Sequence, residues 1–180
     1  FNLVTVPAVS RKLHVKLLEN IQKAEAVSET SEYNILNGQG PWGIICNGVS
    51  FNYVSDAVKD LNIADKIAVL RIGFSNPLPE KLIKKFVAER EKILVVEEGE
   101  PYLEEAVRSF AQEAQSTIPI QGKAENLFSR LYEFNPSQVR EVVANYFGVG
   151  VEVAQIPDLS DVPEIPPRPP NLCAGCSHRA

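Results

Sequence analysis

Apolar residues along this chain recur with two different periods. Leu13, Leu17, Ile21 and Ala24 fall at three- and four-residue steps, which predicts an amphipathic helix from about Ser10 to Ser28. The helical pattern ends before the sequence NGQGPWG, whose glycines and proline interrupt regular structure. The next apolar run, WGIICNG, is short, continuous and rich in β-branched residues, which favours a buried strand.

From this point, helical and strand patterns alternate. Two further continuous apolar runs, KIAVLRI and KILVVEE, predict strands. Helical faces separate and follow them: Val54, Ala57, Val58 and Leu61; Leu82, Ile83, Phe86 and Val87; and Leu103, Ala106, Val107, Phe110 and Ala114. This alternation predicts an α/β fold with a mainly parallel sheet that is covered by helices on both faces.

Several residues mark where helices begin and end. Pro79 and Pro101 suit a first helical turn, because the amide hydrogen that proline lacks has no partner there. Asn135 is expected to cap a last helix, with Gln138 as its reciprocal partner, and Gly148 ends that helix. The proline-rich sequence IPDLSDVPEIPPRPP that follows has the composition of an extended linker.

Composition narrows the function classes. The net charge of -5 argues against a nucleic-acid surface, and no apolar run is long enough to cross a membrane. The chain has three cysteines and no signal peptide pattern, which favours a cytoplasmic protein over a secreted disulfide framework. It starts at Phe1 and contains no methionine, so we expect a piece of a longer protein.

Ligands of open parallel sheets bind beyond the carboxyl ends of the strands. After the first predicted strand, Gly48 allows close approach of a ligand, and Ser50 begins a helix whose free amides attract anions. A turn containing Gly is also common without any ligand. After the second strand, Arg71 offers a fixed positive charge, and Asn76 with the following proline predicts a turn. No G-x-G-x-x-G sequence follows a predicted strand, and no P-loop is present.

Three acidic residues follow the third predicted strand. Glu97, Glu98 and Glu100 precede a helix, whose dipole favours carboxylates at this end, so a structural role is the first interpretation. An acid–base pair is the alternative, although no nucleophile lies nearby. Cys46 lies within an apolar strand and is expected to be buried, whereas His14 is expected at the surface.

The sequence CAGCSHRA contains Cys173, Cys176 and His178. Haem attachment requires the histidine directly after the second cysteine, and a closed zinc site requires four ligands. Ligation of an iron–sulfur cluster together with cysteines from elsewhere stays open.

Several of these sequences together resemble the large, alpha subunit of indolepyruvate ferredoxin oxidoreductases. They are WGIICNGVSFNYVSDAVKDL, IAVLRIGFSNPLPEKLIKKF, ILVVEEGEPYLEEAV, IQGKAENL and RPPNLCAGCSHRA. The resemblance implies an enzyme that oxidatively decarboxylates arylpyruvates to aryl-acetyl-coenzyme A. Such an enzyme uses thiamine diphosphate with magnesium and 4Fe-4S clusters, and has a beta subunit and ferredoxin as partners.

Within that family, the chain resembles the middle domain, which is similar to the C-terminal domain of transketolase. Such a domain is a three-layer α/β/α sandwich with a five-stranded sheet and one antiparallel edge strand. The implied organisation is a connecting segment at 1–30, this domain at 31–150, a linker at 151–170 and the start of the diphosphate-binding domain at 171–180. The chain has no G-D-G motif for the diphosphate, so we expect no catalysis from it alone.

The resemblance also implies that the equivalent domain of related oxidoreductases binds coenzyme A. Gly48, Ser50, Arg71 and Asn76 are the candidate contacts, although Gly73 and Asn76 occupy the positions where arginines are expected. Cys173 and Cys176 are candidate cluster ligands in the intact protein only. The alternative is a structural module that fixes the geometry of domains and subunits in a thiamine-dependent 2-oxoacid oxidoreductase or dehydrogenase.

Overall fold

The computed structural model describes residues 6–150, 160–161, 163 and 166. Five strands form one sheet in the order β1-β3-β2-β4-β5. The strands are β1 (Ile35–Asn37), β2 (Trp42–Asn47), β3 (Ile67–Ile72), β4 (Lys92–Val96) and β5 (Ile120–Gln121). Only the edge strand β1 runs antiparallel, opposite β3. The mainly parallel five-stranded sheet and its antiparallel edge are therefore confirmed.

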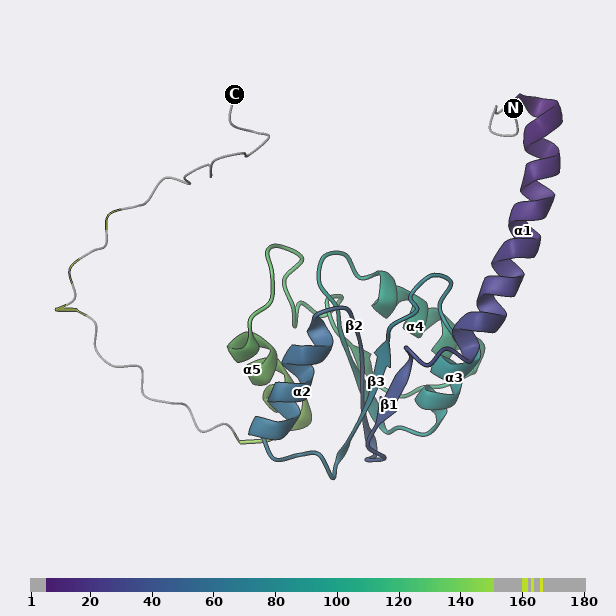
Figure 1. Ribbon diagram of the computed structural model, residues 1–180. Helices are drawn as coiled ribbons and strands as arrows, with labels where there is room; N and C mark the ends of the chain where they lie inside the picture. The colour runs from purple at the N-terminus through teal and green to yellow at the C-terminus, as the bar shows by residue number, and fades with distance from the viewer. Residues whose placement is uncertain (1–5, 151–159, 162, 164–165, 167–180) are drawn as a thin grey trace.

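Helices cover both faces of the sheet (Figure 1). Helices α2 (Ser50–Asp60) and α5 (Pro136–Phe147) pack on one face, and α3 (Glu80–Ala88) and α4 (Tyr102–Glu113) pack on the other. Successive strand residues alternate between the two layers. Ile44 and Cys46 face the α2 and α5 layer, whereas Ile45 between them faces α3 and α4. This two-sided burial explains why the strands are continuously apolar.

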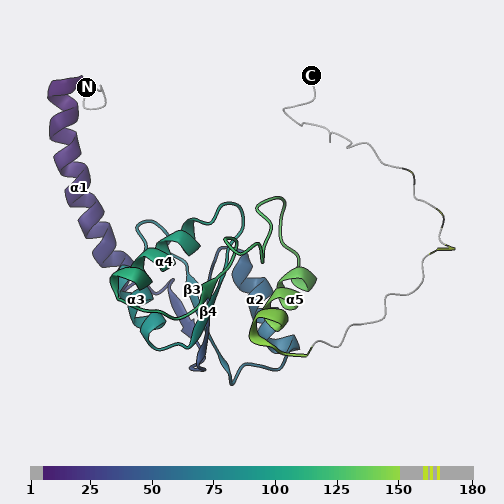
Figure 2. The same ribbon diagram turned by 180° about the vertical axis from the view of Figure 1, so that it is seen from behind.

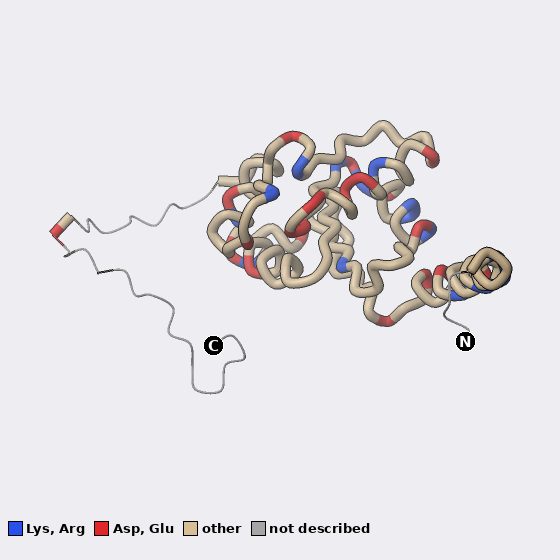
Figure 3. The backbone as a smooth tube through the Cα atoms, turned by 90° about the horizontal axis from the view of Figure 1, so that it is seen from above, with Lys and Arg blue, Asp and Glu red and all other residues tan. Residues whose placement is uncertain are grey.

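The first helix, α1 (Pro7–Glu29), extends away from the sheet (Figures 2 and 3). It spans the predicted segment and begins three residues earlier. His14 lies exposed on it, as expected. No helix in the described part of the chain is long and apolar enough to cross a membrane.

Helix ends differ in detail from the sequence patterns. Pro79 and Pro101 lie one residue outside α3 and α4, as N-cap residues, and not within the first turn. The cap of α5 is confirmed, because the side chain of Asn135 accepts a hydrogen bond from the Gln138 amide, and Gly148 ends the helix with φ 71°. The two short strands β1 and β5 have no apolar run that predicts them.

Cys46 is fully buried, as expected, and burial raises the pKa of its thiol to about 12. Arg71, its neighbour across the β2–β3 pairing, favours the thiolate but does not offset that burial. We therefore describe Cys46 as a small apolar core residue.

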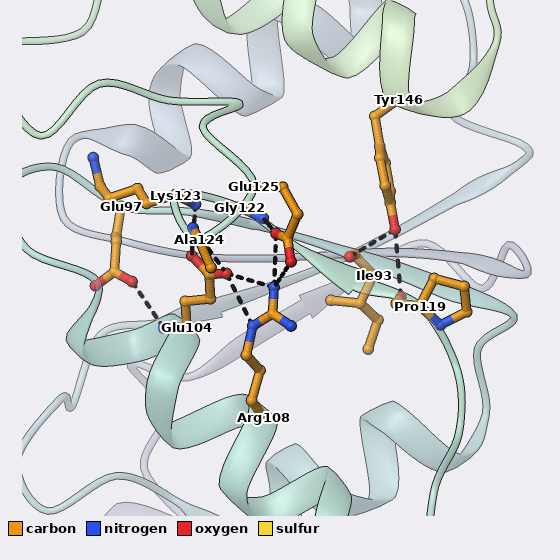
Figure 4. Close-up of polar contacts among 10 residues, drawn as sticks. All are labelled: Ile93, Glu97, Glu104, Arg108, Pro119, Gly122, Lys123, Ala124, Glu125 and Tyr146. Atoms are coloured by element: carbon orange, nitrogen blue, oxygen red, sulfur yellow. Dashed lines mark hydrogen bonds and ion pairs between the residues drawn. The ribbon is translucent and has the colours of Figure 1, made fainter.

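The hydroxyl of Tyr146 fastens α5 to the sheet. It donates a hydrogen bond of 2.9 Å to the carbonyl of Ile93 in β4, and burial raises the pKa of Tyr146 to about 12 (Figure 4). We predict that Tyr146→Phe lowers the free energy of unfolding by about 1 kcal/mol, measured by urea denaturation, because the Ile93 carbonyl loses this partner. Tyr132→Phe is the control, since Tyr132 is 86% exposed. Equal stabilities of the two variants would contradict this role.

Candidate functional site

A crevice lies at the carboxyl ends of β2 and β4. The connection after β2 leads into α2 on one face, and the connection after β4 leads into α4 on the opposite face. The two loops therefore diverge, which is the position where open α/β sheets bind ligands. A cavity of about 250 Å³ lies here, lined by Asn47, Ser75, Leu78 and residues of the loop that leads into α4.

Three of the four predicted contact residues lie at the start of α2 and the end of β3, outside the lining of this cavity. Gly48 has φ 53° and no atom within 4 Å of where a Cβ would lie, so the loop is open above it. Ser50 starts α2 and is buried. Next to it, the Phe51 ring lies 5.0 Å from the guanidinium carbon of Arg71. The region thus combines a helix N-terminus with a positive charge.

Arg71 is half-buried and has no carboxylate within ion-pair distance among the described residues. Asn76 lies exposed in the loop between β3 and α3. No hydrogen bond or ion pair among the described residues joins Asn76 to Gly48, Ser50 or Arg71. A second cavity of about 410 Å³ adjoins Phe51 between α2 and the β1–β3 edge.

The carboxylates on the β4 side of the crevice are bonded to the fold. Glu97 is buried and accepts 2.8 Å hydrogen bonds from the amides of Leu103 and Glu104, at the start of α4. Glu98 accepts from the amide of Phe134 at 2.9 Å. This geometry favours the structural interpretation of these acidic residues over an acid–base pair.

The third carboxylate of this group, that of Glu100, makes an exposed ion pair of 3.3 Å with Arg130. Glu98 and Glu100 thereby connect the β4 loop to the segment 129–134, which precedes α5. An exposed pair contributes little free energy. The hydrogen bond from the Phe134 amide to Glu98 is the stronger of these two interactions.

A fourth acidic residue, Glu104, organises the neighbouring turn, and the sequence patterns did not identify it. Its side chain is 1% exposed and accepts hydrogen bonds from Lys123 N at 2.6 Å and from Arg108 Nη2 at 2.7 Å (Figure 4). Arg108 also bonds both oxygens of Glu125. A Cβ on Gly122 would approach Glu104 Oε2 to 2.6 Å, so glycine is required at the turn. The four-residue spacing of Glu104 and Arg108 is the signal that indicates this pair.

Lys123 is a buried cation at the same turn. Its Nζ donates to the carbonyl of Ser129 at 2.6 Å and lies 4.7 Å from the centre of the Phe134 ring. Burial lowers the pKa of Lys123, against the opposing effect of Glu97 and other carboxylates nearby. The ammonium group therefore fixes the segment 129–134 to this turn, with one of its three donors used by the Ser129 carbonyl.

Metal ligation was predicted for Cys173 and Cys176, which lie outside the described residues together with His178. Within the described ranges, no group of three or more histidine, cysteine or acidic side chains could hold a metal ion. The iron–sulfur prediction therefore stays a prediction.

Known proteins match nearly the whole chain. It is 34% identical to the indolepyruvate oxidoreductase subunit IorA of Methanothermobacter thermautotrophicus, 36% to that of Thermococcus kodakarensis and 37% to that of Archaeoglobus fulgidus, each over 98% of the chain. The chain spans 28% of the length of each of these proteins. No family model matches.

A solved oxidoreductase structure shares the fold. A 2-oxoglutarate:ferredoxin oxidoreductase from Magnetococcus marinus, determined with 2-oxoglutarate, coenzyme A and succinyl-CoA bound, matches 79% of this chain and 24% of its own. The TM-score is 0.52 at 18% identity, which supports a common fold. A split-gene transketolase, described as an inactive beta4 tetramer, matches 63% of this chain and 40% of its own with a TM-score of 0.47 at 17% identity.

The titration of Glu97 yields a prediction about stability. Burial raises the pKa of Glu97, although the amides of Glu104 and Leu103 favour its ionised form. Because the folded pKa lies above the unfolded value of about 4.3, Glu97 contributes stability that is present below that value and lost as the pH rises through the folded pKa. We expect the stability of the unaltered chain relative to Glu97→Gln to be greatest near pH 4 and to fall toward pH 7.

Urea denaturation at steps across this pH range measures the difference. The control is Glu105→Gln, because Glu105 is exposed in the first turn of α4, the helix whose amides bond Glu97. If the unaltered chain instead gains stability relative to Glu97→Gln as the pH rises, the hydrogen bonds from the amides of Leu103 and Glu104 outweigh burial. That result would contradict the expected direction.

Proposed function

We propose that this chain, a segment belonging to the family of indolepyruvate oxidoreductase alpha subunits, is the transketolase C-terminal-like middle domain of such a subunit. The identity of 34–37% over 98% of the chain supports this position. The proposed domain is 31–150. Residues 1–30 would connect it to the preceding domain, 151–170 would be a linker, and 171–180 would begin the diphosphate-binding domain.

The proposed activity belongs to the whole enzyme. It would oxidatively decarboxylate indolepyruvate and related arylpyruvates, form the aryl-acetyl-coenzyme A and pass electrons to ferredoxin. Thiamine diphosphate with magnesium and 4Fe-4S clusters would supply that chemistry, with Cys173 and Cys176 as candidate cluster ligands. A beta subunit would complete the enzyme, which we place in the cytoplasm.

For the domain itself, we infer a contact with the anionic part of coenzyme A on the α2 side of the crevice. The observation that carries this inference is Arg71, a half-buried guanidinium with no carboxylate partner among the described residues, beside the start of α2. The first amides of a helix have no intrahelical acceptor and favour a phosphate. Gly48 leaves the approach to these amides open.

Charge separates the two sides of the crevice. Glu97, Glu98 and Glu100 lie along the cavity next to β4, where a diphosphate would be repelled. Arg71 lies toward α2 and supports anion binding there. The apolar cavity next to Phe51 would accept an uncharged part of the same ligand. Asn76, exposed in the loop after β3, is the most peripheral of the proposed contacts.

The alternative function is a structural module without a ligand. It is favoured by the bonding of Glu97, Glu98 and Lys123 within the fold, which gives each of these side chains a structural role. The two functions differ in one measurable property, the affinity of the α2 side for coenzyme A.

We predict that Arg71→Gln raises the KM for coenzyme A in the full enzyme about tenfold, because a charge-assisted bond to a phosphate is lost. We expect kcat to change little, since the substituted residue lies outside the catalytic domains. Steady-state kinetics with coenzyme A as the varied substrate measures both constants.

Arg140→Gln is the matched control, because Arg140 lies on α5 and its ion pair of 3.8 Å is with Asp60. The unaltered chain should also show NMR shifts at Gly48, Ser50 and Arg71 when it is titrated with coenzyme A to millimolar concentration. An unchanged KM for Arg71→Gln would reject the contact and leave the structural function.

A further inference from the structure

The segment between β5 and α5 is fixed at both of its ends. Phe128 and Phe134 are buried, and their rings stack with the centres 4.9 Å apart. Backbone bonds hold the same two ends, through the Ser129 carbonyl and the Phe134 amide. Residues 130–133 between these anchors therefore form a tip whose base is held in position.

This tip exposes large apolar side chains. Tyr132 is 86% exposed and Leu131 67%, and together with Tyr102, at 77%, they are the most exposed large apolar side chains among the described residues. Tyr132 also has φ 66°, a left-handed backbone conformation that is strained for a bulky residue. An anchored loop that presents apolar groups to solvent is typical of a contact surface.

Tyr102 belongs to the same surface as the tip. It starts α4, and Glu100, two residues earlier, forms the 3.3 Å ion pair with Arg130. The loop that leads into α4 and the segment before α5 lie side by side at one end of the sheet (Figures 1 and 2). Two adjoining loops therefore supply the apolar groups, and we call Tyr102, Leu131 and Tyr132 the tyrosine surface.

The charge around the tyrosine surface is negative. Glu133 lies exposed next to Tyr132 and makes no ion pair among the described residues. Glu98 and Glu100 line the adjacent cavity, and Arg130 offsets one of these charges. A matching occupant therefore combines apolar groups that pack on tyrosine rings with a positive charge.

The chain itself contains such a segment, the sequence PPRPP at 166–170. Proline-rich segments dock on aromatic side chains at low entropic cost, because proline already keeps the backbone extended. Arg168 supplies the positive charge. The acidic residues that follow α5 all precede Pro166, so the chain from there onward is opposite in charge to the surface.

The length of the chain allows this segment to reach the tip. Helix α5 begins directly after the tip and runs for 12 residues, which is about 18 Å, to its far end. Residues 151–165 can span up to roughly 50 Å. The segment 166–170 can therefore return to the end of the sheet at which α5 began.

We propose that residues 166–170 dock on the tyrosine surface, with prolines against its tyrosine rings and the guanidinium of Arg168 at the carboxylate of Glu133. The contact lies within this chain, so it depends neither on coenzyme A nor on a partner subunit. It brings the residues that follow Pro170 to the end of the sheet where the crevice lies.

Fluorine NMR of the chain labelled with 3-fluorotyrosine tests the docking, because each tyrosine ring gives its own resonance. Replacement of the prolines of 166–170 by serine should move the resonances of Tyr102 and Tyr132 and leave that of Tyr33 unchanged. Tyr33 is the control, since it is 62% exposed just before β1, at the opposite edge of the sheet from β5.

Two results would overturn the proposal. One is that the resonances of Tyr102 and Tyr132 do not move, or move no more than that of Tyr33. The other is that they move with protein concentration in the unaltered chain, because a second copy would then cover the surface.

An exchange of charges tests the pairing of Arg168 with Glu133. Arg168→Glu should move the Tyr132 resonance toward its position in the proline-replaced chain, because two carboxylates then face each other. Adding Glu133→Arg should return it, whereas Glu141→Arg, at an exposed position of α5, should not. A resonance that fails to return, or that returns equally with either arginine, would overturn the pairing, while the KM for coenzyme A reports separately on the proposed function.

Discussion

Burial of the central strands on both faces is the constraint on which the rest of this structure depends. Ile44, Ile45 and Cys46 are consecutive and fully buried, so each face of β2 needs its own layer of helices. Parallel strands also require crossover connections, which the helices supply. Once α2 covers one face and α4 the other, the loops after β2 and β4 must diverge. The crevice is thus a consequence of the core.

The polar residues around the crevice supply hydrogen-bond acceptors for backbone amides that this divergence leaves buried. Two loops and the segment 122–134 meet over the strand ends, where buried amides need acceptors. Glu97 and Glu104 provide them, each with a carboxylate removed from water. Arg108 compensates the charge of Glu104, and Lys123 lies close enough to Glu97 to favour its ionised form. A buried carboxylate is tolerated because its partners are already in place.

Sequence patterns predict the parts of this fold that depend on apolar periodicity. The three buried strands and the helical faces have clear patterns, because two-sided or one-sided burial selects the residues directly. Strand β1 contains only Ile35 to Asn37, and Leu36 is exposed, so no pattern distinguishes it from a loop. The role of Glu98 depends on an amide 36 residues later, that of Phe134. Such a partner is set by tertiary structure, so an acidic cluster and a structural anchor look alike in sequence.

The same contacts show why the two sides of the crevice differ in what they can bind. On the β4 side, each nearby carboxylate is bonded to an amide or a cation, and the cation Lys123 is itself held by a carbonyl. On the α2 side, Arg71 contacts an aromatic ring, which leaves the hydrogen-bonding edge of a guanidinium available. A guanidinium stacked on a ring is held in place without being neutralised. The two loops therefore differ in charge: one guanidinium is held in position near the start of α2, and a group of carboxylates lies after β4.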